Sequence, residues 1–230
     1  MKIEKLVLAS HNAGKLRELS AMLAPLGIEV VTQTSLGVAE ADEPHVTFVE
    51  NALAKARHAS RETGLPALAD DSGLCVRALG GRPGVLSARY AGEPKSDIAN
   101  NAKLVSELHG IEDRRAHFYS VIVLVCDADD PRPLIADGEW HGEIIESPRG
   151  DAGFGYDPIF QPEGYDRTFA ELSAEEKNAI SHRGRAFRMM VEVGSLDILG
   201  VLSNASSTIA EGEVLQLVSQ RDISTPEATY

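Results

Sequence analysis

The stretch Leu68-Ala-Asp-Asp-Ser-Gly-Leu74 places two adjacent acids, a serine and a glycine after a short apolar run. The apolar run predicts a β-strand, and Asp-Ser-Gly predicts a tight turn directly after it. The carboxylates of Asp70 and Asp71 would then lie at the end of the strand, where clustered oxygen ligands suit Mg²⁺. An ordinary turn is the competing interpretation, because Asp, Ser and Gly are common turn residues. The stretch alone leaves both open.

Length and composition limit the classes of protein to consider. A chain of 230 residues fits one large α/β domain or a two-lobed one, and 43% hydrophobic residues suffice for a normal core. The formal net charge is −13, and the sequence shows no basic patch of the kind that nucleic-acid-binding proteins carry. A nucleic acid polymer is therefore a disfavoured partner. A small anionic ligand would need a local cluster of Lys and Arg, or a bridging metal.

Location in the cell is also constrained. The sequence has no run of about 18 apolar residues, so no membrane span is expected. Residues Met1–Lys5 lead straight into a strand-like run and do not resemble a signal peptide. Cys75 and Cys126 lie far apart among apolar neighbours. We interpret them as buried thiols in a reducing cytoplasm and not as a metal site.

Apolar periodicity and capping residues predict alternating strands and helices, then a β-ribbon, which indicates an α/β fold with a mixed sheet. The third helix is expected to turn Ile98, Ala102, Val105 and Leu108 inward. The expected strands cover 3–9, 28–31, a central strand at 117–126, and its antiparallel partner at 134–145. The expected helices begin at or just after Ala13, Thr47, Ser96, Ser173 and Ser181.

The hexapeptide Ser10-His-Asn-Ala-Gly-Lys15 joins the first strand to the first helix. Asn12 is a good N-cap, and a helix N-terminus after a strand is a ready anion site. Lys15 in the first turn is disfavoured by the helix dipole unless an anion joins it. A plain capped turn explains the same residues. The hexapeptide is not a Walker A motif, because its first glycine and the Ser/Thr after the lysine are missing.

Two further stretches each have a structural and a functional interpretation. The acids of Glu40-Ala-Asp-Glu43 either form a solvated loop or face a metal held by Asp71, and Lys55 is either solvated or directed toward those acids. The stretch Gly150–Pro158 is either a structural loop or a ligand loop with two flat aromatic faces. His182 and Arg183 lie in the first turn of the last helix. The helix dipole disfavours a cation there unless an anion or a carbonyl group is bound nearby.

Together these motifs resemble the inosine/xanthosine triphosphate pyrophosphatases over about residues 3 to 194. Residues 1–195 would form one nucleoside triphosphate pyrophosphatase domain, and 196–230 an appendage of low order and unknown role. The motifs occur in this order: Ser10–Lys15, Glu50–Ala52 with Lys55, Ala69–Gly73 with Gly80–Gly84, Ser87–Tyr90, Phe154–Pro158, Lys177 and Ser181–Arg183.

The resemblance implies an elongated α/β fold, with a mixed sheet, flanking helices and two lobes around a central nucleotide-binding cleft. It implies a homodimer and Mg²⁺-dependent hydrolysis of ITP, dITP and XTP to the monophosphate and pyrophosphate. It also assigns Asp71 as catalytic proton acceptor and metal ligand, with Asp42 or Glu43 as a second ligand. The substrate-binding residues that it implies are Ser10, His11, Asn12, Ala13, Gly14, Lys15, Lys55, Ser72, Phe154, Gly155, Tyr156, Asp157, Lys177, His182 and Arg183.

Base selection follows from donor and acceptor chemistry. Hypoxanthine and xanthine carry a 6-oxo acceptor and an N1–H donor, and adenine presents the reverse. Asp157 as acceptor, with Lys177 or Arg183 as donor, would pair with the 6-oxo purine, while Phe154 or Tyr156 stacks on the ring. Two alternatives remain open: a nucleotide sensor without hydrolysis, and a pyrophosphatase for modified pyrimidine nucleotides.

Overall fold

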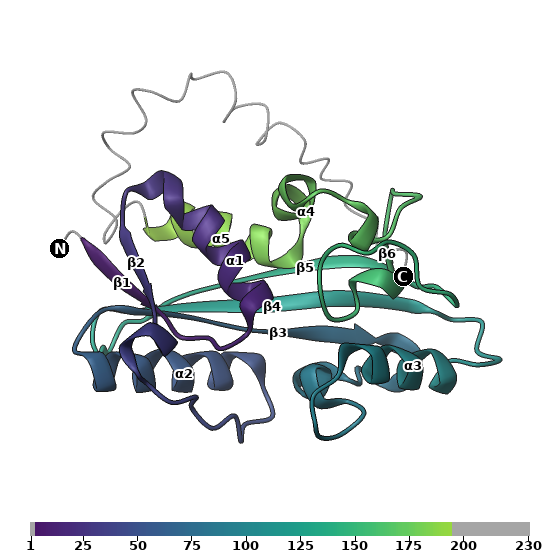
Figure 1. The fold of residues 1–230 in the computed structure, drawn as a ribbon, viewed down its shortest axis with the longest axis horizontal. Coiled ribbons are helices and arrows are strands. Elements are labelled where there is room, and N and C mark those ends of the chain that lie inside the picture. The colour runs from purple at the N-terminus through teal and green to yellow at the C-terminus, as the bar shows by residue number, and fades with distance from the viewer. Residues whose placement is uncertain (1–2, 195–230) are drawn as a thin grey trace, which may run out of the picture.

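The computed structural model describes residues 3–194 and shows one long six-stranded sheet with helices on both faces (Figure 1). The strand order is β2-β1-β3-β4-β5-β6, in which β1 runs parallel to β2 and β3 while the other neighbours are antiparallel. The predicted mixed α/β sheet is therefore confirmed. The strands are β1 (Lys5–Leu8), β2 (Glu29–Thr32), β3 (Ala67–Val76), β4 (Arg115–Val125), β5 (Leu134–Ile144) and β6 (Phe160–Pro162).

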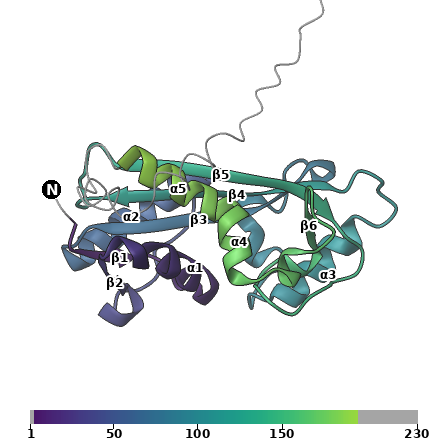
Figure 2. The ribbon, with the colours of Figure 1, turned by 90° about the horizontal axis from the view of Figure 1, so that it is seen from above.

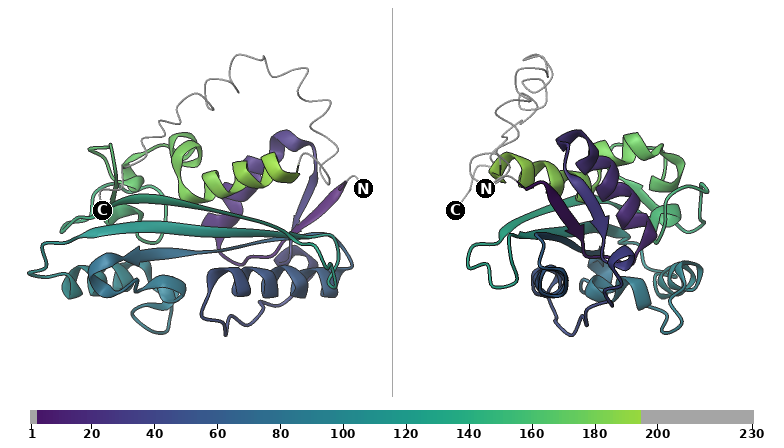
Figure 3. Two further views of the ribbon diagram at one scale, coloured as in Figure 1. Left: turned by 180° about the vertical axis from the view of Figure 1, so that it is seen from behind. Right: turned by 60° about the vertical axis from the view of Figure 1, so that its left-hand side comes forward.

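Three α-helices cover one face of the sheet and two cover the other (Figures 1 and 3). On one face lie α1 (Ala13–Leu23), α4 (Ala174–Ile180) and α5 (His182–Gly194), and on the other lie α2 (Phe48–Thr63) and α3 (Asp97–Glu107). The appendage predicted at 196–230 lies outside the described residues. The short 3-10 helices are η1 (Ala24–Leu26), η2 (Thr34–Leu36), η3 (Arg77–Leu79), η4 (Gly84–Arg89), η5 (Asp157–Ile159) and η6 (Phe169–Glu171).

The long strands β3, β4 and β5 run through two lobes, with β1, β2 and α1 at one end and α3 and β6 at the other (Figure 2). Small side chains let α2 approach the sheet closely, and its buried face carries a stripe of Ala52, Ala56 and Ala59. At the other end the core is aromatic, with Phe118, Phe160 and Phe169 packed together. An alanine-rich core thus fills one lobe and an aromatic core the other, and the two lobes share one sheet.

The helix starts predicted from capping residues are confirmed. Asn12 Oδ1 accepts the Lys15 N–H at 3.0 Å, and Ser96 Oγ accepts the Ala99 N–H at 3.3 Å. Thr47 likewise caps α2, and Ser173 caps α4 in a reciprocal capping box. These side chains satisfy backbone donors that the first helical turn leaves without partners, which fixes where each helix begins.

The turn predicted after Asp71 is wrong, because β3 continues to Val76. Backbone pairing with β4 continues through this stretch, with Asp71 opposite Val121 and Gly73 opposite Tyr119. The continuous ladder overrides the local turn preference of Asp-Ser-Gly. Gly73 instead allows η4 to pass close by, since a Cβ there would overlap the Gly84 carbonyl oxygen. Because side chains alternate along a strand, Asp70 and Asp71 point to opposite faces of the sheet.

The inward face predicted for α3 is right at two of its four positions, since Leu108 is buried and Val105 packs against the core, and wrong at the other two. Ile98 is 84% exposed and Ala102 is exposed, whereas Asn100 and Asn101 are buried beside Leu104. Both polar atoms of the Asn100 amide are hydrogen-bonded: its Oδ1 accepts from Ala91 N at 2.7 Å, and its Nδ2 donates to the Ala88 carbonyl at 3.1 Å. The helix therefore turns its amide side chains toward neighbouring loops, which apolar periodicity does not reveal.

The two cysteines are less buried than the sequence analysis predicted. Cys75 and Cys126 are free, but they are half-buried and not fully buried as predicted. Within residues 3–194, no helix is both long and apolar enough to cross a membrane.

A buried ion-pair cluster around Asp70 ties β3 to the helices above it. Arg183 Nε lies 3.2 Å from Asp70 Oδ1, Lys15 Nζ lies 2.8 Å from Asp70 Oδ2, and Ser120 donates from Oγ at 2.5 Å. Burial raises the pKa of Asp70, but the charges of Arg183 and Lys15 outweigh this effect and hold it well below its usual value. Asp70 is therefore an ionised anchor for α1 and α5.

We expect Asp70→Asn to lower the free energy of unfolding by about 3–5 kcal/mol, because it leaves Arg183 buried without its main counter-charge. Since the folded pKa of Asp70 is depressed, its stabilisation is fully present above the unfolded value of about 3.9. It is lost only as the pH falls through the lower folded value. Urea unfolding at pH 7 and pH 5 should therefore give similar losses.

The control is Asp129→Asn, whose exposed partner Arg61 lies 3.8 Å away. An exposed pair of this kind contributes at most about 1 kcal/mol. Equal stability of the Asp70 and Asp129 variants would contradict the anchoring role.

Candidate active site

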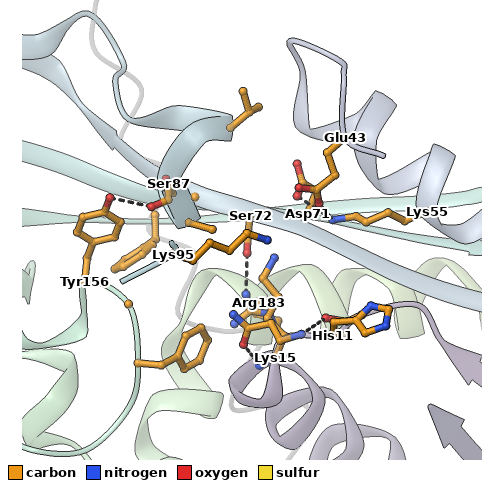
Figure 4. A pocket seen from close by; sticks show the side chains of 18 of the residues that line it. His11, Lys15, Glu43, Lys55, Asp71, Ser72, Ser87, Lys95, Tyr156 and Arg183 are labelled. Atoms are coloured by element: carbon orange, nitrogen blue, oxygen red, sulfur yellow. Dashed lines mark hydrogen bonds and ion pairs between the residues drawn. The ribbon is translucent and has the colours of Figure 1, made fainter. Parts of the chain in front are cut away.

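A cavity of about 240 Å³ lies between the lobes and collects side chains from both faces of the sheet (Figure 4). Of the residues predicted to act at the site, all except Ala13, Gly14 and Asp42 line it. Lining residues that the sequence did not single out as site residues include Gln33, Ser87, Lys95, Asp97 and Phe118. The structure thus brings together motifs that lie as far apart in the chain as Ser10 and Arg183.

The start of α1 forms one wall of the cavity. Ser10 Oγ accepts the Asn12 N–H at 3.1 Å, and His11 Nδ1 lies 2.8 Å from the Gln33 amide nitrogen. Lys15, whose position in the first turn favours an anion, is paired with Asp70 and is largely buried. This wall therefore combines a helix N-terminus with a lysine, as an anion site requires.

On the opposite face of the sheet, Lys55 joins two carboxylates. Its Nζ donates to Glu43 Oε1 at 2.7 Å, to Asp71 Oδ1 at 2.8 Å and to the Asp70 carbonyl at 2.9 Å (Figure 4). Burial lowers the pKa of Lys55, but the charges of Asp71 and Glu43 outweigh burial and raise it above its usual value. Lys55 thus points toward the acids, one of the two orientations that the sequence allowed.

Asp71 keeps one oxygen free. Its Oδ2 is buried without a hydrogen-bond partner in the described part of the chain. Burial raises the pKa of Asp71, and the nearby charge of Lys55 only partly opposes this effect. Asp70 and Asp71 are neighbours in sequence with opposite pKa shifts, so only Asp71 combines a raised basicity with an uncommitted oxygen.

The donor set around Lys55 fits Mg²⁺. Glu43 and Asp71 both contact the Lys55 ammonium group, and Asp71 Oδ2 is left without a partner in the described residues, whereas Asp42 is exposed and does not line the cavity. No group of three or more His, Cys, Asp or Glu side chains suited to a metal occurs within residues 3–194. Two protein carboxylates are nevertheless enough for Mg²⁺, which usually takes its other oxygen ligands from water and phosphates.

The far end of the cavity is aromatic and charged. Lys177 Nζ lies 2.5 Å from Asp157 Oδ2 and 4.6 Å from the centre of the Phe154 ring. Asp157 also accepts the Phe154 N–H at 2.8 Å, which fixes the loop. The Phe154 ring lies against Gly14, where any Cβ would overlap it. Gly14 thus leaves room for the Phe154 ring and does not itself line the cavity.

The start of α5 places His182 and Arg183 at the same end. The His182 imidazole stacks on Phe118 with ring centres 4.7 Å apart and planes at 9°. Burial, together with the charges of Arg183 and Lys177, holds the pKa of His182 well below its usual value, so its imidazole is neutral. Its Nδ1 has no hydrogen-bond partner among the described residues. His182 therefore retains hydrogen-bonding capacity.

Arg183 is largely committed to the protein. Its guanidinium pairs with Asp70 and Glu18 and donates to Ser72 Oγ at 2.7 Å. Glu18 also lies 2.9 Å from Lys177 Nζ, so it links the two cations. We did not predict Glu18 from the sequence. Its position three residues after Lys15, on the same side of α1, was the available signal.

Tyr156 is held by the lobe that contains η4. Its hydroxyl donates to the Ser87 carbonyl at 2.9 Å, and only 3% of the residue is exposed. Of the two aromatic candidates for stacking, Phe154 is therefore the one placed between the lobes.

The Ham1 family model matches residues 6–193. A curated relative from Nitrosomonas europaea is 66% identical over 83% of this chain and 94% of its own length, and is named dITP/XTP pyrophosphatase. A relative of the same name from Ralstonia nicotianae is 63% identical over 83% of this chain and 96% of its own length.

Solved structures agree with this assignment. A HAM1 protein from Coxiella burnetii superimposes with a TM-score of 0.77 at 49% identity, covering 83% of this chain and 98% of that one. The Staphylococcus aureus Ham1 protein gives a TM-score of 0.74 at 38% identity, covering 84% and 100%. The family match spans the sheet, the helices and the whole cavity, and the chain therefore belongs to the Ham1 family.

Proposed function

We propose that this protein hydrolyses ITP, dITP and XTP to the nucleoside monophosphate and pyrophosphate. The observation that carries the proposal is one cavity in which an anion-binding helix start and two lysines face an aromatic, hydrogen-bonding slot. The dITP/XTP pyrophosphatase name of the curated relatives supports the same activity. Hydrolysis of such nucleotides would remove them from the pool of polymerase substrates.

The triphosphate would lie along the first turn of α1 and between Lys15 and Lys55. Both lysines are now paired with carboxylates at 2.7–2.8 Å, so phosphate oxygens would exchange with or add to these partners. Charge builds on phosphate oxygens as the phosphoanhydride bond breaks, and fixed cations stabilise that charge. Ser72, which lines the same cavity, would contact the substrate between its two ends (Figure 4).

Asp71 and Glu43 would hold Mg²⁺, with Asp71 using its unpartnered Oδ2. When bound there, the ion would neutralise charge on the phosphate oxygens. Asp71 would also accept the proton of the attacking water, a role favoured by its raised pKa. Lys55, which contacts both acids, would keep their charges balanced before substrate arrives.

The purine would occupy the slot formed by Phe154, Asp157, Lys177 and His182. Phe154 would stack on the ring, since it lies between the lobes. Neutral His182 can donate to or accept from the base, whereas most Arg183 donors are engaged by protein groups. Arg183 would therefore orient the slot more than read the base, a smaller role than the resemblance implied.

We further propose that the protein works as a cytoplasmic homodimer. Free cysteines at positions 75 and 126 are compatible with a reducing compartment. Light scattering at several protein concentrations would test the dimer.

Replacing Asp71 should nearly abolish turnover. We expect Asp71→Asn to lower kcat for ITP by about 10²–10⁴-fold, because it removes the proton acceptor and a metal-ligand charge. EDTA should abolish pyrophosphate release by the wild-type protein, and added Mg²⁺ should restore it. The control is Asp166→Asn, which alters an exposed acid outside the cavity.

Circular dichroism should show both variants folded. Near-normal turnover by Asp71→Asn would disprove its assignment. Binding of ITP without any pyrophosphate release by the wild-type protein would favour the sensor alternative.

The base preference is tested with a nucleotide panel. Values of kcat/KM for ITP, dITP and XTP should exceed that for ATP by about 100-fold or more, because adenine leaves the polar groups of the slot mismatched. Comparable values for ATP and ITP would contradict the proposed slot, and a preference for modified pyrimidine nucleotides would favour the other hydrolase.

A further inference from the structure

We propose that Asp97 and Asn101 of α3 are positioning residues that hold the base loop, Gly153–Asp157, by clamping Gly155. The proposal rests on the proposed function, because it assumes that this loop contacts the purine. Neither residue belongs to the site that the family resemblance predicts. Their role would be to set the direction of Phe154 and Asp157.

The clamp consists of two hydrogen bonds to the main chain of one residue. Asp97 Oδ2 accepts the Gly155 N–H at 2.7 Å, and Asn101 Nδ2 donates to the Gly155 carbonyl at 3.1 Å. The two side chains are four residues apart and therefore lie on one side of α3. Gly155 has a φ of +63°, a conformation that glycine adopts readily. Both of its main-chain polar groups are thus held in an unusual turn.

Asn101 fits this role better than a role in α3 stability. It is buried, and its Oδ1 has no hydrogen-bond partner in residues 3–194. A buried acceptor without a partner destabilises a fold, so an apolar residue at this position would suit the helix alone. The hydrogen bond that Asn101 does make is directed to the base loop.

Gly155, which the clamp holds, lies between Phe154 and Asp157, the two residues of this loop that would contact the purine. Phe154 precedes Gly155, and its N–H is bound by Asp157. Tyr156 follows Gly155 and is tied to Ser87. Releasing Gly155 would let the Phe154 ring and the Asp157 carboxylate shift together. The start of α1 and Lys55 of α2, which would hold the phosphates, belong to the other lobe.

The experiment uses Asp97→Ala, Asn101→Leu and the double variant. The matched control is Ser96→Ala, which removes the N-cap of the same helix but leaves both clamp residues. Three quantities are measured: kcat/KM for ITP and ATP, the inhibition constant of inorganic tripolyphosphate, and hydrogen exchange in residues 153–157 without ligand.

In the double variant, we expect KM for ITP to rise about 10-fold and the ITP-to-ATP ratio of kcat/KM to fall by a similar factor. The tripolyphosphate constant should change less than about two-fold, because the phosphate end is untouched. Exchange in the base loop should accelerate. Ser96→Ala should lower Tm while the ratio and loop exchange stay unchanged.

Unchanged loop exchange in the double variant would overturn the clamp, whatever the protein hydrolyses. Equal weakening of ITP and tripolyphosphate would also overturn it, because the effect would then be general. If the wild-type protein does not prefer ITP over ATP, the proposed function fails. The exchange measurement then still decides whether Asp97 and Asn101 hold the loop.

Discussion

The pairing of buried charges around Asp70 is the constraint on which the site depends. Asp70 binds Lys15 and Arg183, and Glu18 binds Arg183 and Lys177, so opposite charges alternate from the phosphate end to the base end. Buried charges are tolerated only when they are paired, and this requirement fixes α1, α4 and α5 relative to β3. The network therefore sets the distance between the two ends of the cavity.

Strand geometry gives the two neighbouring acids different tasks. Because β3 continues past Asp71, Asp70 faces the helices above the sheet while Asp71 faces Lys55 and Glu43 below it. Asp70 is surrounded by donors and stays ionised, whereas Asp71 has a free buried oxygen and a raised pKa. One acid stabilises the framework, and its neighbour remains available for chemistry.

Local signals in the sequence predicted helix starts and the mixed sheet, because caps and apolar runs act over a few residues. Most of the predicted cavity-lining residues came instead from the family resemblance. The local signals did not predict that β3 would continue, since pairing with β4 depends on residues about fifty positions away. They also misplaced part of the buried face of α3, where Asn100 and Asn101 point inward to bind loops. The choice of Glu43 over Asp42 likewise required the position of Lys55.

The most direct test of the central claim is a crystal structure with Mg²⁺ and a non-hydrolysable inosine triphosphate analogue. The account predicts hypoxanthine beside Phe154 and His182, phosphates at the start of α1, and the metal ion on Asp71. The base and the phosphates would thus occupy opposite ends of the one cavity that Asp70 and Arg183 hold together. A ligand bound on another surface, or a metal ion that Asp71 does not contact, would contradict it.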